Sequence, residues 1–337
     1  MLDARPRHSR TAFSATGLIV GLLVVAATAV AVVLVVIMSP REPELTLGKD
    51  FSYDVSRFRA IDPKLIHYEE AASFPTGLEW ARGMALDAAG RVHVAGDQVV
   101  RTFAPDGARQ GEVQTGKAAH CVAVAADGSL FVGLVDHVAV FTPDGTRRAA
   151  WESLGKDAFI KAITIADSNV FVADAGRGEV LRCDLQGKVL GRIGRKDDDR
   201  NIPGLHVPSP YCDLAVGPAG LLWVTNTGRL RLEAYTFDGD LEAHWGKASF
   251  AIEGFCGCCN PTNFAFLPDG KVVTSEKGLP RVKVYTFEGT LDGVVAGPDQ
   301  FARHASGLDL AVDAQGRVLV LDAAASTVRI FARKKTQ

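Results

Sequence analysis

The chain has 337 residues, and its 37 lysines and arginines against 39 aspartates and glutamates give a formal net charge of −2. A near-neutral chain whose body has no long basic stretch lacks the electrostatic surface that nucleic acids require, so we expect no nucleic-acid partner. With 34 glycines and only 3 methionines, the composition suits many tight turns between short strands and disfavours a helical bundle.

The N-terminal region predicts a membrane anchor. Residues 11–40 carry no charged side chain, and residues 17–38 are almost continuously apolar. A helix of that length spans the ~30 Å hydrocarbon core and is longer than the apolar part of a cleavable signal peptide. Arg5, Arg7 and Arg10 precede it, whereas the flank after it is nearly neutral. The positive-inside rule then keeps the N-terminus in the cytoplasm and exports the body to the periplasm or cell surface.

After residue 78, short apolar strands and glycine-containing turns recur with a fixed pattern. Glycine supplies the positive φ that tight hairpins need. Five of the six first turns contain it, and so do the five second turns, at residues 103–107, 141–145, 183–187, 235–239 and 285–289. The first turns of the six units lie at residues 87–90, 126–128, 167–169, 217–220, 268–270 and 313–316. Two hairpins in each period of roughly 40–50 residues make a four-stranded unit, which is typical of a β-propeller blade.

The sixth unit ends with its third strand at residues 328–331 and leaves no fourth strand. The segment at 65–74 can supply it, and closure between the two chain ends would remove exposed sheet edges. The sequence therefore predicts an all-β, six-bladed propeller preceded by one N-terminal transmembrane helix. The expected division is a cytoplasmic N-terminus at 1–14, a transmembrane anchor at 15–39, a linker at 40–64, the propeller at 65–333 and a tail at 334–337.

The inner strands at 83–87 and 309–313, each followed by Gly-Arg-Val-x-Val, resemble those of the NHL-repeat family of propellers. The resemblance covers residues 78–331 and implies the fold. It specifies function poorly, because members of that family include ligand-binding scaffolds, lyases and lactonase-like enzymes. The Cys-Gly-Cys-Cys loop within 253–261 resembles a membrane-anchored bacterial subset of the family.

Two of the six cysteines have ordinary core explanations. Cys183 occupies a third-strand position that the other units fill with Phe or Tyr, and Cys121 opens an inner strand. Buried thiols behave as small apolar side chains. We therefore expect both residues to be packed in the core.

The other four cysteines form the main candidate site. Cys256, Cys258 and Cys259 lie in the loop before the fifth inner strand, and Cys212 lies just before the fourth. Loops that feed neighbouring inner strands meet at one mouth of the central channel, where four thiolates could hold zinc or an iron–sulfur cluster. The Cys-x-Cys-Cys spacing matches no standard pattern, and disulfides in an exported compartment or thiol redox chemistry remain open alternatives.

Two further sets of residues are candidates at the same mouth. His120 and His206 are alternative ligands, because imidazole suits the same metals. Asp213, Asn263 and Asp309 take the same inner-strand position in three consecutive units, so their oxygens form an alternative hard-cation site, as in propellers that resemble gluconolactonases. Plain hydrogen bonding at the strand starts would explain the same three residues.

These features predict a membrane-anchored extracytoplasmic propeller that acts as a binding or scaffold protein with a protein partner at the membrane. Its cysteine-ligated metal or iron–sulfur site suggests a role in electron transfer. The alternatives are an interaction platform with disulfide-stapled loops and a metal-dependent, lactonase-like hydrolase. The sequence contains no nucleophile elbow, phosphate-binding loop or His-Glu-x-x-His motif, so a non-enzymatic function is favoured.

Overall fold

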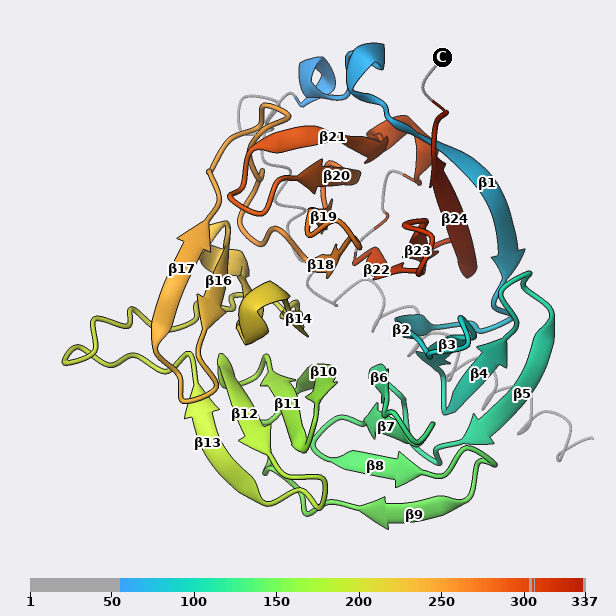
Figure 1. Cartoon of the computed structure of the whole chain (residues 1–337), viewed down its shortest axis with the longest axis vertical. Helices are drawn as coiled ribbons and strands as arrows, with labels where there is room; N and C mark the ends of the chain where they lie inside the picture. Colours follow the sequence, from blue (N-terminus) through green and yellow to red (C-terminus); the bar gives the residue numbers. More distant parts are fainter. Residues whose placement is uncertain (1–54, 303–304, 306, 336–337) are drawn as a thin grey trace, which may run out of the picture. The chain divides into compact units, whose positions relative to one another are not determined.

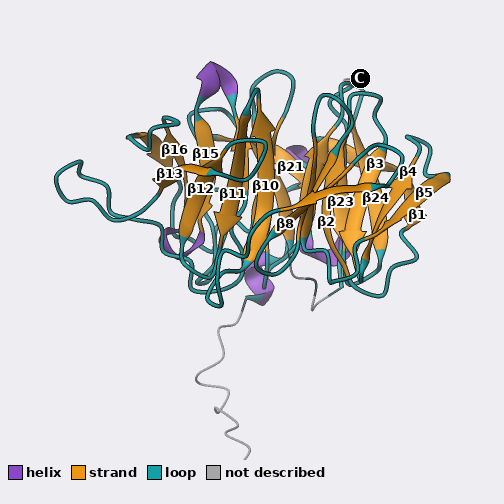
Figure 2. Cartoon of the chain, turned by 90° about the horizontal axis from the view of Figure 1, so that it is seen from below, coloured by secondary structure: helices purple, strands orange, loops and turns teal. Residues whose placement is uncertain are grey.

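The computed structural model describes residues 55–302, 305 and 307–335. The predicted transmembrane segment lies outside these residues, and no helix within them has the length and apolar character needed to cross a bilayer. Regular structure in the described ranges is β-strand, interrupted by short 3-10 turns of three residues each (Figure 2). The predicted all-β class is confirmed for this part of the chain.

Six four-stranded antiparallel sheets surround a common centre as the blades of a propeller (Figure 1). Blade one contains β2 (Ala81–Leu86), β3 (Val92–Gly96), β4 (Val99–Phe103) and β5 (Arg109–Gln114); blade two contains β6 (Cys121–Val124), β7 (Leu130–Gly133), β8 (Val138–Phe141) and β9 (Arg147–Ala150); blade three contains β10 (Ile160–Ala166), β11 (Asn169–Asp174), β12 (Glu179–Cys183) and β13 (Val189–Ile193). The predicted six-bladed propeller is therefore confirmed.

The remaining three blades have the same strand order from the centre outward. Blade four contains β14 (Leu214–Val216), β15 (Leu222–Asn226), β16 (Arg231–Tyr235) and β17 (Leu241–Trp245); blade five contains β18 (Asn263–Phe266), β19 (Val272–Glu276), β20 (Arg281–Tyr285) and β21 (Leu291–Ala296); blade six contains β22 (Asp309–Val312), β23 (Val318–Asp322), β24 (Thr327–Arg333) and β1 (Tyr68–Pro75). Only blade six combines strands from the two ends of the described chain.

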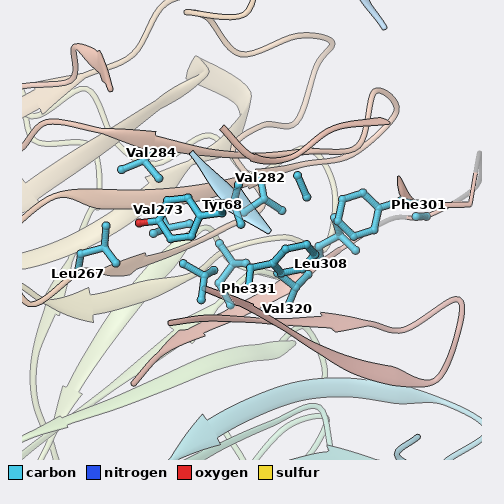
Figure 3. Packing of buried hydrophobic residues seen from close by; sticks show 14 residues of the cluster. Tyr68, Leu267, Val273, Val282, Val284, Phe301, Leu308, Val320 and Phe331 are labelled. Atoms are coloured by element: carbon cyan, nitrogen blue, oxygen red, sulfur yellow. The ribbon is translucent and has the colours of Figure 1, made fainter. Parts of the chain in front are cut away.

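The outer strand of blade six comes from the upstream segment. β1 pairs antiparallel with β24, and the two lie side by side although they stand at opposite ends of the colour scale (Figure 1). Tyr68 packs in a buried cluster with Val282 of blade five and Phe331 of blade six (Figure 3). The strand begins three residues later than expected, because residues 63–65 form a 3-10 turn capped by the carboxyl of Asp62.

The glycines of the second turns are required by close packing between blades. At three of these glycines, an aromatic ring at or just after the outer strand of the preceding blade lies against the glycine Cα. The pairs are Gly107 with Phe74, Gly187 with Trp151 and Gly289 with Trp245, and an added Cβ would meet the ring at 2.7, 2.4 and 2.6 Å respectively. These glycines also have positive φ, so both the limited space and the backbone conformation favour glycine over any larger residue.

Candidate functional site

The six inner strands enclose a central cavity of about 420 Å³. Among the described residues that line it, the charged side chains are Arg82, Lys161, Asp213 and Asp309. Each stands at or next to the beginning of an inner strand. Because the inner strands of all blades run in the same direction, these four side chains gather at one end of the channel. We call this end the charged mouth; apart from Asn263 and Thr164, the remaining lining residues have apolar side chains.

Asp213, Asn263 and Asp309 each reach from one blade to the next. Asp213 Oδ2 accepts a hydrogen bond from the backbone N–H of Phe264 at 2.9 Å. Asn263 Nδ2 donates to Asp309 Oδ1 at 2.9 Å. Asp309 Oδ2 in turn accepts from the backbone N–H of Met84 at 2.6 Å. The three side chains thus join blades four, five, six and one in series.

Blades one to three meet at the same level without such polar links. A Cβ added to Gly83 would lie 2.9 Å from Cys121 Cα and 2.9 Å from the carbonyl oxygen of His120, so the two inner strands are in close contact. Cys121 and Ala162, which take the equivalent positions in blades two and three, are buried. At the aligned positions, small side chains and close packing therefore take the place of the hydrogen bonds, and the polar contact between blades one and two is made one position earlier, by Arg82 and His120.

Each oxygen of the two carboxyl groups of the charged mouth accepts at least one hydrogen bond from the protein. Asp213 Oδ1 accepts the backbone N–H of Leu214 at 2.9 Å, and Asp309 Oδ1 accepts that of Leu310 at 3.0 Å. The sequence allowed two interpretations of these residues, hydrogen bonding at the strand starts and a hard-cation site. The hydrogen bonds are present, and the cation site stays a prediction. Burial, followed by the charge of Asp309, raises the pKa of Asp213 to about 8. The pair therefore holds a proton at neutral pH.

Two cations of the charged mouth were missed by the sequence reasoning. Lys161 Nζ lies 6.0 Å from the ring centroid of Tyr211 and forms no salt bridge with any described carboxylate. An Arg82 guanidinium nitrogen (NH1) lies 3.2 Å from His120 Nε2. Both residues stand one position before the aligned inner-strand residues. The same alignment that places His120 and Cys212 at the mouth would therefore have placed them there as well.

The two histidines have different environments. His120 is buried and packs edge-to-face on Phe159, with ring centroids 4.9 Å apart. Burial, followed by the positive charge of Arg82, lowers the pKa of His120 to about 4, so its ring is neutral at pH 7. His206 is exposed in the loop between β13 and β14, where its backbone N–H donates to Asn226 Oδ1 at 3.0 Å.

Three of the cysteines are packed in apolar surroundings. Cys183 and Cys121 are buried, which confirms their predicted place in the core. Cys212 is also buried, in an apolar cluster between blades three and four that includes Ala162 and Leu214. Burial raises the pKa of the Cys212 thiol to about 12. Cys212 is therefore protonated at neutral pH in this arrangement.

The Cys-Gly-Cys-Cys loop brings two thiols together. Cys258 Sγ and Cys259 Sγ are 3.2 Å apart; Cys258 is exposed, and Cys259 is buried. Cys256 is buried at the base of the loop, where its backbone N–H donates to Glu276 Oε2 at 3.0 Å. Within the described ranges, no three side chains of His, Cys, Asp or Glu form a group that could hold a metal ion. The shared zinc or iron–sulfur centre thus stays a prediction without a preformed ligand set.

A buried ion cluster that the sequence reasoning missed anchors this loop. Glu276 Oε1 accepts from Arg281 Nε at 2.9 Å and from Lys283 Nζ at 2.7 Å, and all three side chains are inaccessible to solvent. Lys283 Nζ also donates to the carbonyl oxygen of Gly254 at 2.6 Å. The detectable signal was the presence of three charged residues within strands β19 and β20, whose neighbours are mostly apolar.

Comparisons with known proteins show the architecture and no more. The sequence matches no protein-family model and no curated protein, so membership of the NHL-repeat family is not established. Virginiamycin B lyase from Staphylococcus aureus superposes with a TM-score of 0.56 at 11% identity, covering 79% of this chain and 100% of that one. A streptogramin B lyase gives 0.54 at 12%, covering 75% and 79%. A protein of unknown function from Bacteroides thetaiotaomicron gives 0.58 at 14%, covering 79% and 76%. At these identities the chain shares with them the fold of a β-propeller alone.

Proposed function

We propose that this chain is an extracytoplasmic binding protein, held at the membrane by the apolar segment at residues 17–38, whose charged mouth binds a small anion such as a carboxylate. The observation that carries the proposal is the ammonium group of Lys161, which lines a cavity of about 420 Å³ and forms no salt bridge with a described carboxylate, although Asp213 and Asp309 lie near enough to feel its charge. A cavity of this volume is in the range of small-molecule sites.

The balance of charge at the mouth favours an anionic ligand. Arg82 and Lys161 contribute two positive charges, while Asp213 and Asp309 share a proton and together contribute about one negative charge. His120 is neutral. A ligand carboxylate would balance the excess positive charge of the mouth by pairing with Lys161 in a partly desolvated site, where ion pairs are stronger than in water.

The binding proposal is tested by isothermal titration with acetate, lactate and citrate as probes. We expect at least one of these anions to bind the full-length protein in detergent, and Lys161→Met to weaken its binding by about tenfold or more, because one desolvated ion pair is lost. Lys156→Met is the matched control, since Lys156 is an exposed lysine in the loop that leads into β10. Equal affinity in the two variants would contradict the proposal.

A lactonase-like hydrolase is the second candidate, and one observation favours it. The carboxyl of Asp213 keeps its proton at neutral pH beside the cavity, and a protonated carboxyl can donate to a leaving oxygen. Incubation with a γ-lactone separates the two functions. Turnover that disappears in Asp213→Asn supports the hydrolase, whereas anion binding without turnover supports the binding protein.

Electron transfer through a metal or iron–sulfur centre on Cys212, Cys256, Cys258 and Cys259 stays a third proposal, supported by the 3.2 Å contact between two of the thiols. It requires the loop to approach Cys212, which is packed between blades three and four. Metal analysis and a visible spectrum of anaerobically purified protein test it. Bound iron or zinc that is lost in Cys258→Ser and kept in Cys183→Ser would support the centre, and metal-free protein would exclude it.

A further inference from the structure

Blade one differs from the other five blades at one buried position. His93 on β3 pairs with Ala85 on β2 and with Thr102 on β4, which places it in the second strand at the middle of the blade. The residues at the same register in blades two to six are Phe131, Phe171, Trp223, Val273 and Leu319. Five blades therefore fill this position with an apolar side chain, and blade one alone fills it with an imidazole.

The imidazole of His93 connects a hydroxyl to a carboxylate. Thr102 Oγ1 lies 3.0 Å from His93 Nδ1, and His93 Nε2 lies 3.3 Å from Asp87 Oδ2. Burial opposes ionisation of Asp87, but hydrogen bonds from the backbone and side chain of Arg91 outweigh it and hold the pKa of Asp87 below its usual value. An ionised carboxylate only accepts hydrogen bonds, so His93 Nε2 carries the proton and Nδ1 is free to accept the proton of Thr102.

Blade six provides an internal comparison. Arg317 Nε donates to Asp313 Oδ2 at 2.6 Å, which repeats the contact between Arg91 and Asp87 at the same turn. Leu319 stands there in place of His93. The acidic residue and the arginine thus serve the turn in both blades, whereas the imidazole and the hydroxyl are additions in blade one that the turn does not need.

A cavity of about 250 Å³ opens beside these two groups, between blades one and two. Thr102, His93 and Arg91 line it, together with Gly111 on β5. Gly111 pairs with Thr102, and a Cβ added there would meet nothing within 4 Å. The space next to the hydroxyl of Thr102 is therefore open, and the guanidinium of Arg91 places positive charge on its wall.

We propose that Thr102, His93 and Asp87 form an acyl-transfer site that accepts a small, neutral carboxylic ester. The arrangement contains a hydroxyl nucleophile, a base and a carboxylate that orients the base, in the geometry by which such sites are recognised. Burial also lowers the pKa of His93, so the ring is neutral at pH 7 and can accept a proton. Asp144 at the cavity wall disfavours an anionic substrate, whereas the charge of Glu112 is compensated by Arg101 and Arg109.

The reaction balances with water as the only co-reactant. Thr102 Oγ bonds to the ester carbonyl carbon as its proton passes to His93 Nδ1, and Arg91 stabilises the developing oxyanion. The carbon–oxygen bond to the alcohol then breaks as His93 returns the proton to the leaving oxygen. Water, deprotonated by His93, attacks the acyl group on Thr102, so one ester and one water give one acid and one alcohol.

The full-length protein in detergent is tested with p-nitrophenyl acetate, in a Cys258→Ser background that removes the exposed thiol. We expect release of p-nitrophenolate and, after quenching, an acetyl group on Thr102 by peptide mass spectrometry. Thr102→Val removes the hydroxyl, keeps the side-chain shape, and should lower turnover by about a hundredfold or more. Thr102→Ser should restore a large part of it.

Two further variants separate chemistry from folding. His93→Phe installs the residue found in blades two and three, and should abolish acetylation while the melting temperature is kept or raised. Thr327→Val, on a strand of blade six, is the control and should leave turnover unchanged. Absence of turnover in the unaltered protein, turnover that survives Thr102→Val, or an acetyl group on another residue would each overturn the proposal.

Discussion

Asp213 shows how burial changes the chemistry of a single side chain. Two backbone N–H groups favour its anion, but burial and the nearby charge of Asp309 favour the protonated form and raise the pKa of Asp213 from 3.8 to about 8. Between these values the folded protein binds a proton that the unfolded chain has lost. The stabilising contribution of this group is therefore present at low pH and is lost as pH rises towards 8.

Asp213→Asn removes this titration. We expect the free energy of unfolding of the unaltered protein to increase relative to that of the variant as pH falls from 8 to 5. The slope should reach at most about 1.4 kcal/mol per pH unit, the value for one proton. Urea unfolding at several pH values measures it, and Asp157→Asn, at an exposed site, is the control. A difference that does not change with pH would contradict the assignment.

Glu276 is the central anion of a buried ion cluster, and it cannot be neutralised without leaving two cations unbalanced. Arg281 and Lys283 both bind its carboxylate, and all three side chains are buried. We expect Glu276→Gln to lower the free energy of unfolding by about 3–5 kcal/mol, because it leaves uncompensated buried charge. Glu288→Gln, an exposed change in the same blade, should alter stability by less than about 0.5 kcal/mol in the same denaturation experiment.

At the scale of strands and turns, the sequence predicted the structure well where the signals are local. The hairpin glycines and apolar strands gave six units in the observed order, since turn chemistry and side-chain alternation act over a few residues. Repeat register also placed Cys212 and Asp213 at one end of the channel. It did not show that neighbouring residues on an extended chain face opposite sides. Cys212 packs between blades three and four, whereas Asp213 binds Phe264 of blade five.

Other parts of the site depend on contacts that cross several repeats, which a single sequence does not display. The ion cluster around Glu276 forms because a loop folds back over strands that carry Arg281 and Lys283. The cavity beside Thr102 exists because Gly111 has no side chain and blade two leaves the space open. Both features involve residue types that were visible in the sequence, but their partners are fixed by tertiary packing.

Two turn glycines, Gly187 in a second turn and Gly270 in a first turn, allow a matched pair of substitutions. Gly187 and Gly270 have φ of +91° and +83°, but an added Cβ would lie 2.4 Å from Trp151 at the first and meet nothing within 4 Å at the second. We expect Gly270→Ala to cost about 1–2 kcal/mol for the left-handed backbone. Gly187→Ala should cost a further 1–3 kcal/mol or so for overpacking. Equal losses of unfolding free energy in urea denaturation would show that the Trp151 ring moves aside for the added methyl group at no cost.

For the molecule as a whole, stability depends on the contact between the two ends of the described chain. β1 completes blade six and covers the edge of β24, and its Phe74 packs against the second turn of blade one. Tyr68 and Phe74 lie in two different buried clusters, which join blade six to blades five and one respectively. Loss of β1 would therefore open the ring and uncover a sheet edge at the same place.

Comparison of two shortened chains, one beginning at residue 62 and one at residue 78, tests this closure. The first keeps β1 and loses a 3-10 turn that contains no buried residue, so it should melt close to a chain that begins at residue 55. The second loses β1, and we expect its melting temperature to fall by about 10 °C or more, because two aromatic side chains leave the core. Its uncovered β24 edge should also cause self-association in analytical ultracentrifugation. If the chain that begins at residue 78 stayed monomeric and melted with the other two, the ring would not depend on its upstream strand.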